Sequence, residues 1–505
     1  MDISEFRKRG KEMVDFIADY IETVRGRKVL PDVHPGFLIQ QLPNHPPKHP
    51  EPWKDIMEDV ENLIVPGLYH FRHPSCHAYY PINSSLPSVL GDFLDAGFGC
   101  IGPAWECNPA GTELQMMMMD WLAEMIGLPE EFKYTSGTGG GTLLGTASEA
   151  MLVCLVAARQ RALSHLKQMY PKVSDGDLCS KMMGYCSTMT HRAAVKAGRI
   201  AGIKFRIVEC DDKYSLRGQT LATAMQEDKK RGMFPMFVCA TIGTTPVCSH
   251  DNLEEIGPVC EREKAWLYVD AAYAGTALVC PEFQYLLKGV EYIDSFDFNP
   301  YKMMLTTIYG SALWVRNKKE LQDALTEESE YLPDNDQIED FRHWSVELGQ
   351  GFRSLKVWMV IRAYGISGIQ EHVRKQVRLA KLFEKLVKQD ARFEVLGEVN
   401  LGLVCFRLKG SNDLNHRLLD AVTHTRMVSM IGCELKGKFV IRFVVTAEST
   451  DDDVIRRDWN IIKHVANRLI LKIEGDSSLL RKQGHRLSIQ RRRSSFEVLG
   501  STSSN

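Results

Sequence analysis

The sequence lacks several features that would place it in a special class at once. In 505 residues no apolar run approaches the length of a transmembrane helix, so we expect no membrane span. The first eight residues are charged where a secretory signal would be apolar. The thirteen cysteines are odd in number and show no CxxC spacing. They predict reduced thiols in the cytoplasm, with no disulfide framework and no metal site.

Charge and composition exclude further classes. The formal net charge of −2 gives no reason to expect nucleic acid as a partner. There is no GxxxxGK[ST] run, so a nucleotide P-loop is not expected either. With 44% hydrophobic and 25% charged residues, the chain has the composition of an ordinary globular protein. Its length allows a large core in more than one domain.

The N-terminal part reads as an amphipathic helix followed by an extended connector. Apolar residues between Asp2 and Val24 recur at helical spacing: Phe6, Met13, Phe16, Ile17, Tyr20, Ile21 and Val24. The proline-rich stretch 43–50 cannot continue a helix. The pattern leaves two alternatives for the apolar face of the helix. It packs either on its own chain or on a partner subunit.

The middle of the chain has the pattern of a parallel sheet. Short apolar runs such as 236–241 and 266–269 alternate with helical segments. Continuous apolar runs that alternate with helices are typical of parallel strands buried on both faces of a sheet. From about Gly365 the pattern changes to a long helix, strands near 393–407 and 438–445, and a closing helix. This change predicts a second, smaller α+β domain.

Lys302 and Asp270 carry the first chemical signal. Asp270 ends the apolar run that starts at Trp266, and Lys302 follows in the run 294–304. Catalysis with pyridoxal phosphate (PLP) needs an amine that forms a Schiff base and a carboxylate that keeps the pyridine nitrogen protonated. Either residue alone fits an ordinary α/β domain equally well. The prediction of a PLP site from these two residues therefore depends on the rest of the sequence.

Small residues upstream predict a phosphate site. The sequence Gly145-Thr146-Ala147-Ser148 leads into an apolar helix, and a helix N-terminus favours an anion. Ser and Thr also cap ordinary helices, so this signal is weak on its own. His191 lies before another helix, where a capping or packing role is the ordinary alternative. Along the chain, the phosphate loop is followed by the histidine, then by Asp270 and then by Lys302. One PLP site on a parallel sheet could be assembled from parts in this order.

Seven stretches extend this order into a family resemblance. They are His77–Pro81, Thr112–Leu114, Met119–Leu122, Asp270–Gly275, Phe298–Pro300 with Lys302, Phe341–Trp344 and Phe352–Lys356. Over roughly residues 1–475 the chain resembles the group II PLP-dependent amino-acid decarboxylases. Within that family it is closest to animal aromatic-L-amino-acid decarboxylases and also similar to histidine decarboxylases.

The resemblance implies an α/β protein of the PLP-dependent transferase type, with the aspartate aminotransferase type I fold. A mostly parallel central sheet would carry helices on both faces. The implied parts are an N-terminal helical dimerisation segment (1–84), a large PLP-binding domain (85–360) and a small C-terminal α+β domain (361–475). Beyond them, the Ser- and Arg-rich composition of residues 476–505, with few apolar residues, predicts a disordered tail. The implied partner is a second copy of the chain, in a cytoplasmic homodimer.

The resemblance also implies a role for each site residue. Lys302 forms the Schiff base, Asp270 pairs with the pyridine nitrogen, and His191 and Ala272 lie on opposite faces of the ring. Thr146, Ala147, Ser148 and Asn299 hold the phosphate, and Thr245 lines the site near the cofactor. Tyr331 matches the tyrosine of a mobile loop that returns a proton to Cα. The polar composition of residues 326–340 fits an ordinary surface loop as well.

The expected reaction is decarboxylation of an aromatic L-amino acid, of the DOPA, 5-hydroxytryptophan or tyrosine class, to its amine and CO₂. An aromatic acetaldehyde synthase is the first alternative. Insect synthases replace the histidine and plant synthases replace the loop tyrosine, whereas this chain keeps His191 and Tyr331. Histidine decarboxylases tend to carry serine where this chain has Gly349. A PLP aminotransferase and a catalytically weak relative kept for binding are the remaining alternatives.

Several positions depart from the family pattern. The expected substrate-pocket residues are Tyr79, Ile82, Ile101, Pro103 and Gly349. Ile82 stands where threonine is common, and Pro103 replaces a phenylalanine of the pocket. Tyr301 replaces the usual histidine before the lysine, the run 307–311 is altered, and the loop after Tyr331 is shorter. Even a methyl-sized pocket change is worth about 1–3 kcal/mol of discrimination, so these departures bear on substrate choice.

Overall fold

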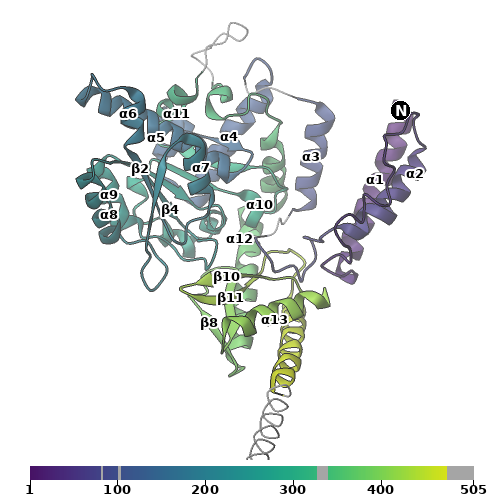
Figure 1. The fold of residues 1–505 in the computed structure, drawn as a ribbon. Helices are drawn as coiled ribbons and strands as arrows, with labels where there is room; N and C mark the ends of the chain where they lie inside the picture. The colour runs from purple at the N-terminus through teal and green to yellow at the C-terminus, as the bar shows by residue number, and fades with distance from the viewer. Residues whose placement is uncertain (81–83, 101–103, 327–338, 475–505) are drawn as a thin grey trace, which may run out of the picture.

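The computed structural model describes residues 1–80, 84–100, 104–326 and 339–474 (Figure 1). Four predicted site residues, Ile82, Ile101, Pro103 and Tyr331, lie outside these described residues. The tail predicted to be disordered, 476–505, also lies outside them.

A seven-stranded sheet forms the centre of the large domain, in the order β1-β7-β6-β5-β4-β2-β3. Its strands are β1 (Gly140–Leu144), β2 (Met182–Ser187), β3 (Lys204–Val208), β4 (Phe234–Thr241), β5 (Trp266–Asp270), β6 (Ser295–Phe298) and β7 (Ser311–Val315). β7 runs antiparallel to both of its neighbours, and the pairs from β3 to β6 are parallel. The mostly parallel central sheet predicted from the sequence is confirmed.

Helices cover both faces of this sheet, as the continuous apolar strands predict. On β5, Trp266 and Tyr268 join the core of one face, and Leu267 and Val269 join the core of the other. The first face carries α5 (Ala147–Met169), α6 (Asp175–Ser180), α7 (Ala193–Ala201) and α11 (Lys318–Leu325). The second carries α4 (Pro109–Ile126), α8 (Gly218–Lys230) and α9 (Leu253–Glu263).

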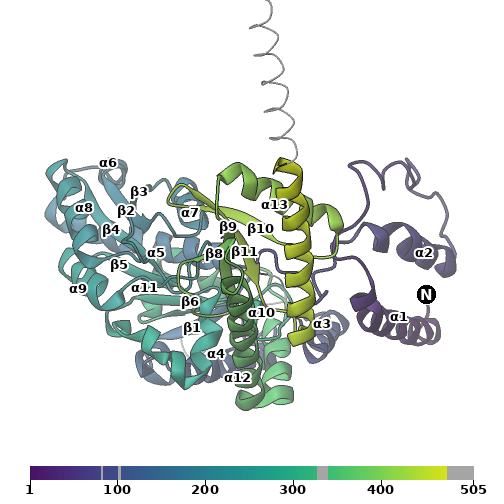
Figure 2. The same ribbon diagram turned by 90° about the horizontal axis from the view of Figure 1, so that it is seen from below.

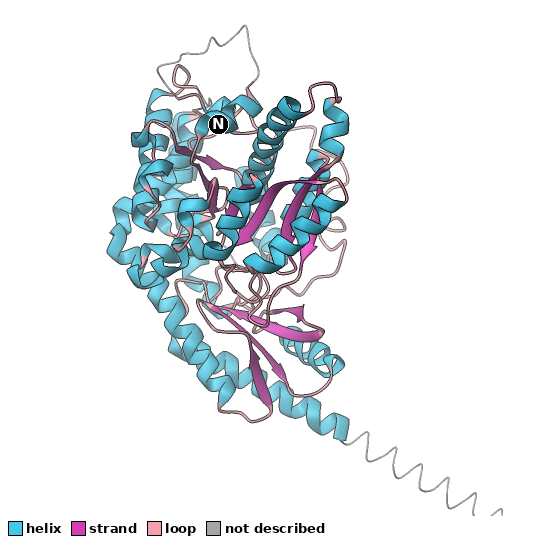
Figure 3. Ribbon diagram, turned by 90° about the vertical axis from the view of Figure 1, so that its left-hand side faces the viewer, coloured by secondary structure: helices cyan, strands magenta, loops and turns pink. Residues whose placement is uncertain are grey.

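The small domain is built on a separate antiparallel sheet, which Figure 3 shows apart from the large one. Its order is β10-β11-β9-β8, with β8 (Phe393–Leu396), β9 (Leu403–Leu408), β10 (Ile431–Leu435) and β11 (Lys438–Val444). The second half of α12 (Arg353–Lys388), α13 (Asn412–Thr425) and a helix over 452–474 complete its core. Figure 2 shows that last helix beside α12.

Helix α12 belongs to both domains and bends between them. At Gly365 the backbone takes φ +64° and ψ 173°, which a side chain would strain. The half before Gly365 packs on α3 (Leu86–Phe98). A Cβ at Gly91 of α3 would lie 2.6 Å from the Cα of Lys356, so only glycine permits this close approach. The predicted change of pattern near Gly365 therefore coincides with a physical bend.

The N-terminal helices stand away from the body of the chain (Figures 1 and 2). The predicted first helix is present as α1 (Ile3–Thr23), none of whose residues is buried, and α2 (Trp53–Asp59) follows the connector. Short 3₁₀ or π turns link the larger elements: η1 (Val24–Gly26), η2 (Val60–Ile64), η3 (Val65–Gly67), η4 (Glu130–Phe132), η5 (Tyr134–Ser136), η6 (Ala274–Val279), η7 (Pro281–Leu287), η8 (Val290–Tyr292) and η9 (Phe341–Trp344). Among the helices described, none is both long and apolar enough to cross a bilayer.

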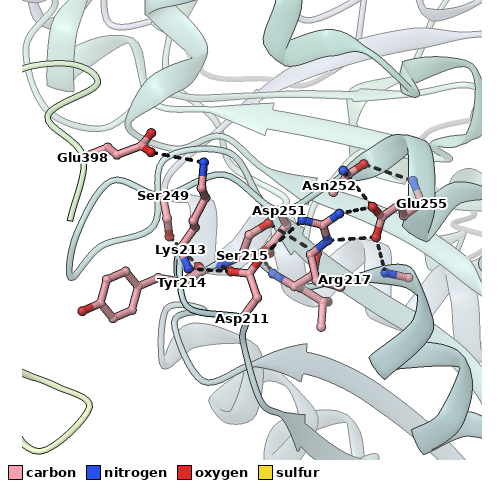
Figure 4. Close-up of polar contacts among 12 residues, drawn as sticks. Asp211, Lys213, Tyr214, Ser215, Arg217, Ser249, Asp251, Asn252, Glu255 and Glu398 are labelled. Atoms are coloured by element: carbon pink, nitrogen blue, oxygen red, sulfur yellow. Dashed lines mark hydrogen bonds and ion pairs between the residues drawn. The ribbon is translucent and has the colours of Figure 1, made fainter.

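Buried Asp251 fixes the carboxyl end of β4 (Figure 4). One carboxylate oxygen accepts the N–H of Leu216 at 2.7 Å, and the other accepts the N–H of Thr241 at 2.8 Å. Burial raises the pKa of Asp251 to about 7. The loop that carries Leu216 also reaches the small domain, because Lys213 forms a 3.4 Å ion pair with Glu398. Asp251 thus ties this interdomain loop to the edge of the sheet where the candidate site lies.

Candidate active site

The site lies where the carboxyl ends of the parallel strands meet, beside a cavity of about 230 Å³. Open α/β sheets bind ligands at this edge because successive strands deliver side chains to it. The cavity is lined by all nine predicted cofactor residues: Thr146, Ala147, Ser148, His191, Thr245, Asp270, Ala272, Asn299 and Lys302. Residues far apart in the sequence are thus assembled in one place.

One end of the cavity is the N-terminus of α5. Thr146 caps this 23-residue helix, and its hydroxyl accepts the N–H of Glu149 at 3.3 Å. Ala147 and Ser148 form the start of the first turn, where backbone N–H groups have no acceptor within the helix. The helix dipole adds a positive potential there. This end of the cavity can therefore hold a phosphate group.

Asn299 lines the same cavity, and its side-chain amide has a polar atom without a hydrogen-bond partner among the described residues. It precedes α10 (Pro300–Met303), and its backbone N–H donates to the carbonyl of Ala272 at 3.1 Å. Its side-chain Nδ2 donates to the Tyr301 hydroxyl at 3.0 Å, whereas its buried Oδ1 has no hydrogen-bond partner among the described residues. A buried amide beside the N-terminus of α5 fits the phosphate of PLP if its NH₂ group, rather than this oxygen, is turned toward the phosphate.

Asp270 is the acid at the floor of the cavity, with 6% of its surface exposed. Its Oδ1 accepts the N–H of Ala272 at 2.9 Å. A second carboxyl group, that of Asp297, is paired with it in the β5–β6 ladder and is fully buried. Asp297 accepts hydrogen bonds from Tyr268 at 2.6 Å and Ser311 at 3.2 Å. Burial and the neighbouring Asp270 raise the pKa of Asp297 well above its ordinary range.

Lys302 follows β6 and lies among aromatic rings. Its Nζ is 5.7 Å from the ring centre of Tyr80, which stacks on Tyr273 with 3.8 Å between ring centres. The guanidinium of Arg442, on β11, lies 5.0 Å from the same Tyr80 ring. Burial lowers the pKa of Lys302, and the Asp270 charge opposes that shift. A lowered pKa favours the neutral amine, which is the nucleophilic form.

His191 lies at the start of α7 and also lines the cavity. Its Nδ1 accepts the N–H of Ala193 at 3.2 Å, so it caps the start of α7 while it lines the cavity. Burial lowers the pKa of His191; the charge of Asp270 opposes this shift, and Lys302 adds a smaller contribution in the lowering direction. The ring is therefore neutral near pH 7, and the contact with Ala193 leaves the proton on Nε2.

Two of the five predicted substrate-pocket residues, Tyr79 and Gly349, belong to the described part of the chain. Tyr79 is 55% exposed with φ +61°, and Gly349 is exposed with no atom within 4 Å of its would-be Cβ. Neither residue lines the cavity. The substrate pocket and the proton donor therefore stay predictions.

Four contributors to the site were not predicted from the sequence. In the sequence, Tyr80 stands out only as part of a stretch that matches the family. Arg442 carries no local signal because it reaches the site from the small domain. Asp297 stands in register with Asp270, which only the sheet pairing reveals. Tyr301, noted only as a departure, is also part of the cavity wall.

The family comparison agrees with this geometry. The profile described as the pyridoxal-dependent decarboxylase conserved domain matches residues 35–409. The chain is 46% identical to the aromatic-L-amino-acid decarboxylase of Rattus norvegicus over 475 residues, which are 93% of this chain and 99% of the relative. It is 45% identical to the histidine decarboxylase of Homo sapiens over 474 residues, which are 93% of this chain and 72% of the relative.

Solved structures show the same fold with different chemistries. Tryptophan decarboxylase from Catharanthus roseus, in complex with L-tryptophan, superposes with a TM-score of 0.88 at 37% identity. The 4-hydroxyphenylacetaldehyde synthase from Rhodiola rosea superposes with a TM-score of 0.87 at 36% identity. Each covers 93% of this chain, and 99% of each solved chain is matched. The fold alone therefore does not separate decarboxylase from synthase.

Proposed function

The chain belongs to the pyridoxal-dependent decarboxylase family, and we propose that it converts an aromatic L-amino acid into the corresponding amine and CO₂. The observation that carries the proposal is the single cavity lined by all nine predicted cofactor residues. The similarity to aromatic-L-amino-acid decarboxylase and to a tryptophan decarboxylase supports an aromatic substrate. Gly349, which matches the aromatic rather than the histidine enzymes, points the same way.

Each residue has a distinct task in this proposal. Bound PLP supplies an electron sink that takes up the bonding electrons when CO₂ leaves. Lys302 would provide the amine that holds the cofactor. Asp270 would keep a proton on the ring nitrogen, and the N-terminus of α5 with Asn299 would hold the phosphate. His191 would lie against one face of the ring, and Tyr331 is retained from the resemblance as the proton donor to Cα.

The proposed function is tested by following products from purified, PLP-loaded protein. The candidate substrates are DOPA, 5-hydroxytryptophan, tyrosine, tryptophan, phenylalanine and histidine. We expect amine and CO₂ in equal amounts from an aromatic substrate, without aldehyde. Aldehyde formed together with H₂O₂ would instead identify an acetaldehyde synthase. Amine from histidine alone would identify a histidine decarboxylase, and amino-group exchange with a keto acid would identify an aminotransferase.

We also infer that the working unit is a homodimer. Apolar side chains are exposed along two helices: Ile3, Phe6, Val14 and Ile17 on α1, and Leu86, Leu90, Phe93 and Phe98 on α3. A single chain leaves them in water, and patches of this kind mark interaction surfaces. Sedimentation equilibrium should give twice the mass of the chain. A monomer that retains full activity would contradict the proposal.

The cytoplasmic location is likewise inferred. All thirteen cysteines are free, as expected of a chain kept in a reducing compartment. Fractionation of the cells that make the protein would contradict the inference if the chain were found outside the cytoplasm.

A further inference from the structure

We propose that Tyr301 is a positioning residue that turns the side-chain amide of Asn299, so that its NH₂ group donates to the cofactor phosphate. The inference rests on the function proposed above, because it takes PLP as the occupant of the cavity. It goes further by giving a task to the position where the chain departs from the histidine usual in the family.

The contact between the two side chains is direct and lies at the phosphate end of the cavity. The Tyr301 hydroxyl and Asn299 Nδ2 are 3.0 Å apart, and both residues line the cavity with Thr146 and Ser148. Only 2% of the surface of Asn299 is exposed, so water does not compete for its amide. Among the described residues, Tyr301 is the one hydrogen-bond partner recorded for that amide.

The hydrogen-bond inventory of the amide decides its orientation. With Nδ2 toward Tyr301, the buried Oδ1 is left without a partner. A phosphate carries only acceptors, so an amide oxygen turned toward it would face negative charge. The oxygen and nitrogen of an amide exchange places on a half-turn. After that turn Oδ1 accepts the Tyr301 hydroxyl proton, and Nδ2 donates to the phosphate.

This arrangement requires a phenol that keeps its proton. Burial raises the pKa of Tyr301 to about 12, and the carboxyl groups of Asp297 and Asp270 act in the same direction. The hydroxyl is therefore a donor at any pH at which the enzyme would work. A phenylalanine at this position would keep the ring and remove the group that distinguishes the two ends of the amide.

The test compares the binding of two ligands to apoenzyme. PLP and pyridoxal differ by the phosphate, and both are followed by the absorbance change on binding. Tyr301→Phe should raise the Kd for PLP about tenfold, the expected loss of one well-oriented hydrogen bond to a charged group. The Kd for pyridoxal should stay within about twofold of wild type. Tyr309→Phe, at an exposed tyrosine close by, is the matched control and should change neither value.

Asn299→Ala examines the same contact from the other side. It should weaken PLP and spare pyridoxal, and Tyr301→Phe should add nothing further in that background, as for two residues acting through one contact. Equal losses for PLP and pyridoxal would show a packing role and overturn the proposal. A full additional loss in the double variant would show that Tyr301 contacts the phosphate by itself, and would also overturn it. Wild-type protein that binds neither ligand would refute the proposed function instead.

Discussion

Replacement of Lys302 by alanine is expected to lower kcat by about 10⁴-fold and to abolish the visible absorbance of the bound cofactor. The factor is the upper end of the range for one group that takes part in bond-making steps. Lys302 lies in the cavity beside Asp270 and the Tyr80 ring, with its pKa lowered by burial. In the described cavity lining it is the one lysine, so no neighbour replaces its amine.

A measurement of stability toward urea distinguishes the loss of the catalytic amine in Lys302→Ala from a loss of activity through unfolding. Burial lowers the folded-state pKa of Lys302, so the charged side chain is less favourable in the native cavity than in water. Lys302→Ala should therefore unfold in urea at no lower concentration than wild type. The exposed Lys319, replaced in the same way, provides the control and should keep full activity. Wild-type turnover by Lys302→Ala would rule out the proposed Schiff-base lysine.

Asp270→Asn is expected to have the second largest effect, and in a different pattern. The amide preserves the shape of the carboxylate and can still accept the Ala272 N–H at 2.9 Å. It removes the negative charge that would hold a proton on the ring nitrogen. We expect kcat to fall by about 10²–10⁴-fold. The Kd for PLP should rise by about 10- to 150-fold, the equivalent of losing a charged hydrogen bond.

The visible absorbance of the cofactor distinguishes the two variants. Asp270→Asn keeps the amine of Lys302, so PLP-loaded protein should still show the lysine-bound cofactor band. Asp212→Asn is a suitable control because this carboxylate is fully solvent-exposed and, among the described residues, forms an ion pair with Lys436 on the surface. Asp270→Asn with unchanged PLP affinity and unchanged kcat would show that Asp270 does not pair with the ring.

The cofactor end of the site was predictable because its signals are local. Gly145 to Ser148 mark a helix start, Asp270 ends an apolar strand, and Lys302 follows the next one. In a parallel sheet the carboxyl ends of the strands lie along one edge. Residues that follow successive strands are therefore brought together at that edge. Nothing beyond strand pattern, turn residues and family resemblance was needed for this part.

The remainder of the site depends on contacts that leave no local trace. Arg442 reaches Tyr80 from a strand of the small domain, and no spacing in the sequence links the two. The pairing of Asp297 with Asp270 requires the register of β5 and β6, which apolar runs do not fix. Tyr79 and Gly349 were assigned to the substrate pocket by resemblance alone, and neither lines the described cavity.

The pairing of β1 with β7 has a consequence for how the protein is made. β1 is an edge strand whose partner β7 is encoded far downstream, so this pair closes one of the longest loops in the sheet. Thr146 follows β1 and Lys302 precedes β7. The two ends of the cavity therefore come together only when β1 pairs with β7. Pairings between distant segments form slowly because the loop entropy comes first. The cavity is complete only in the chain that has formed this pair, so PLP bound there would stabilise the folded chain by mass action. We therefore expect that PLP present during synthesis raises the yield of folded enzyme.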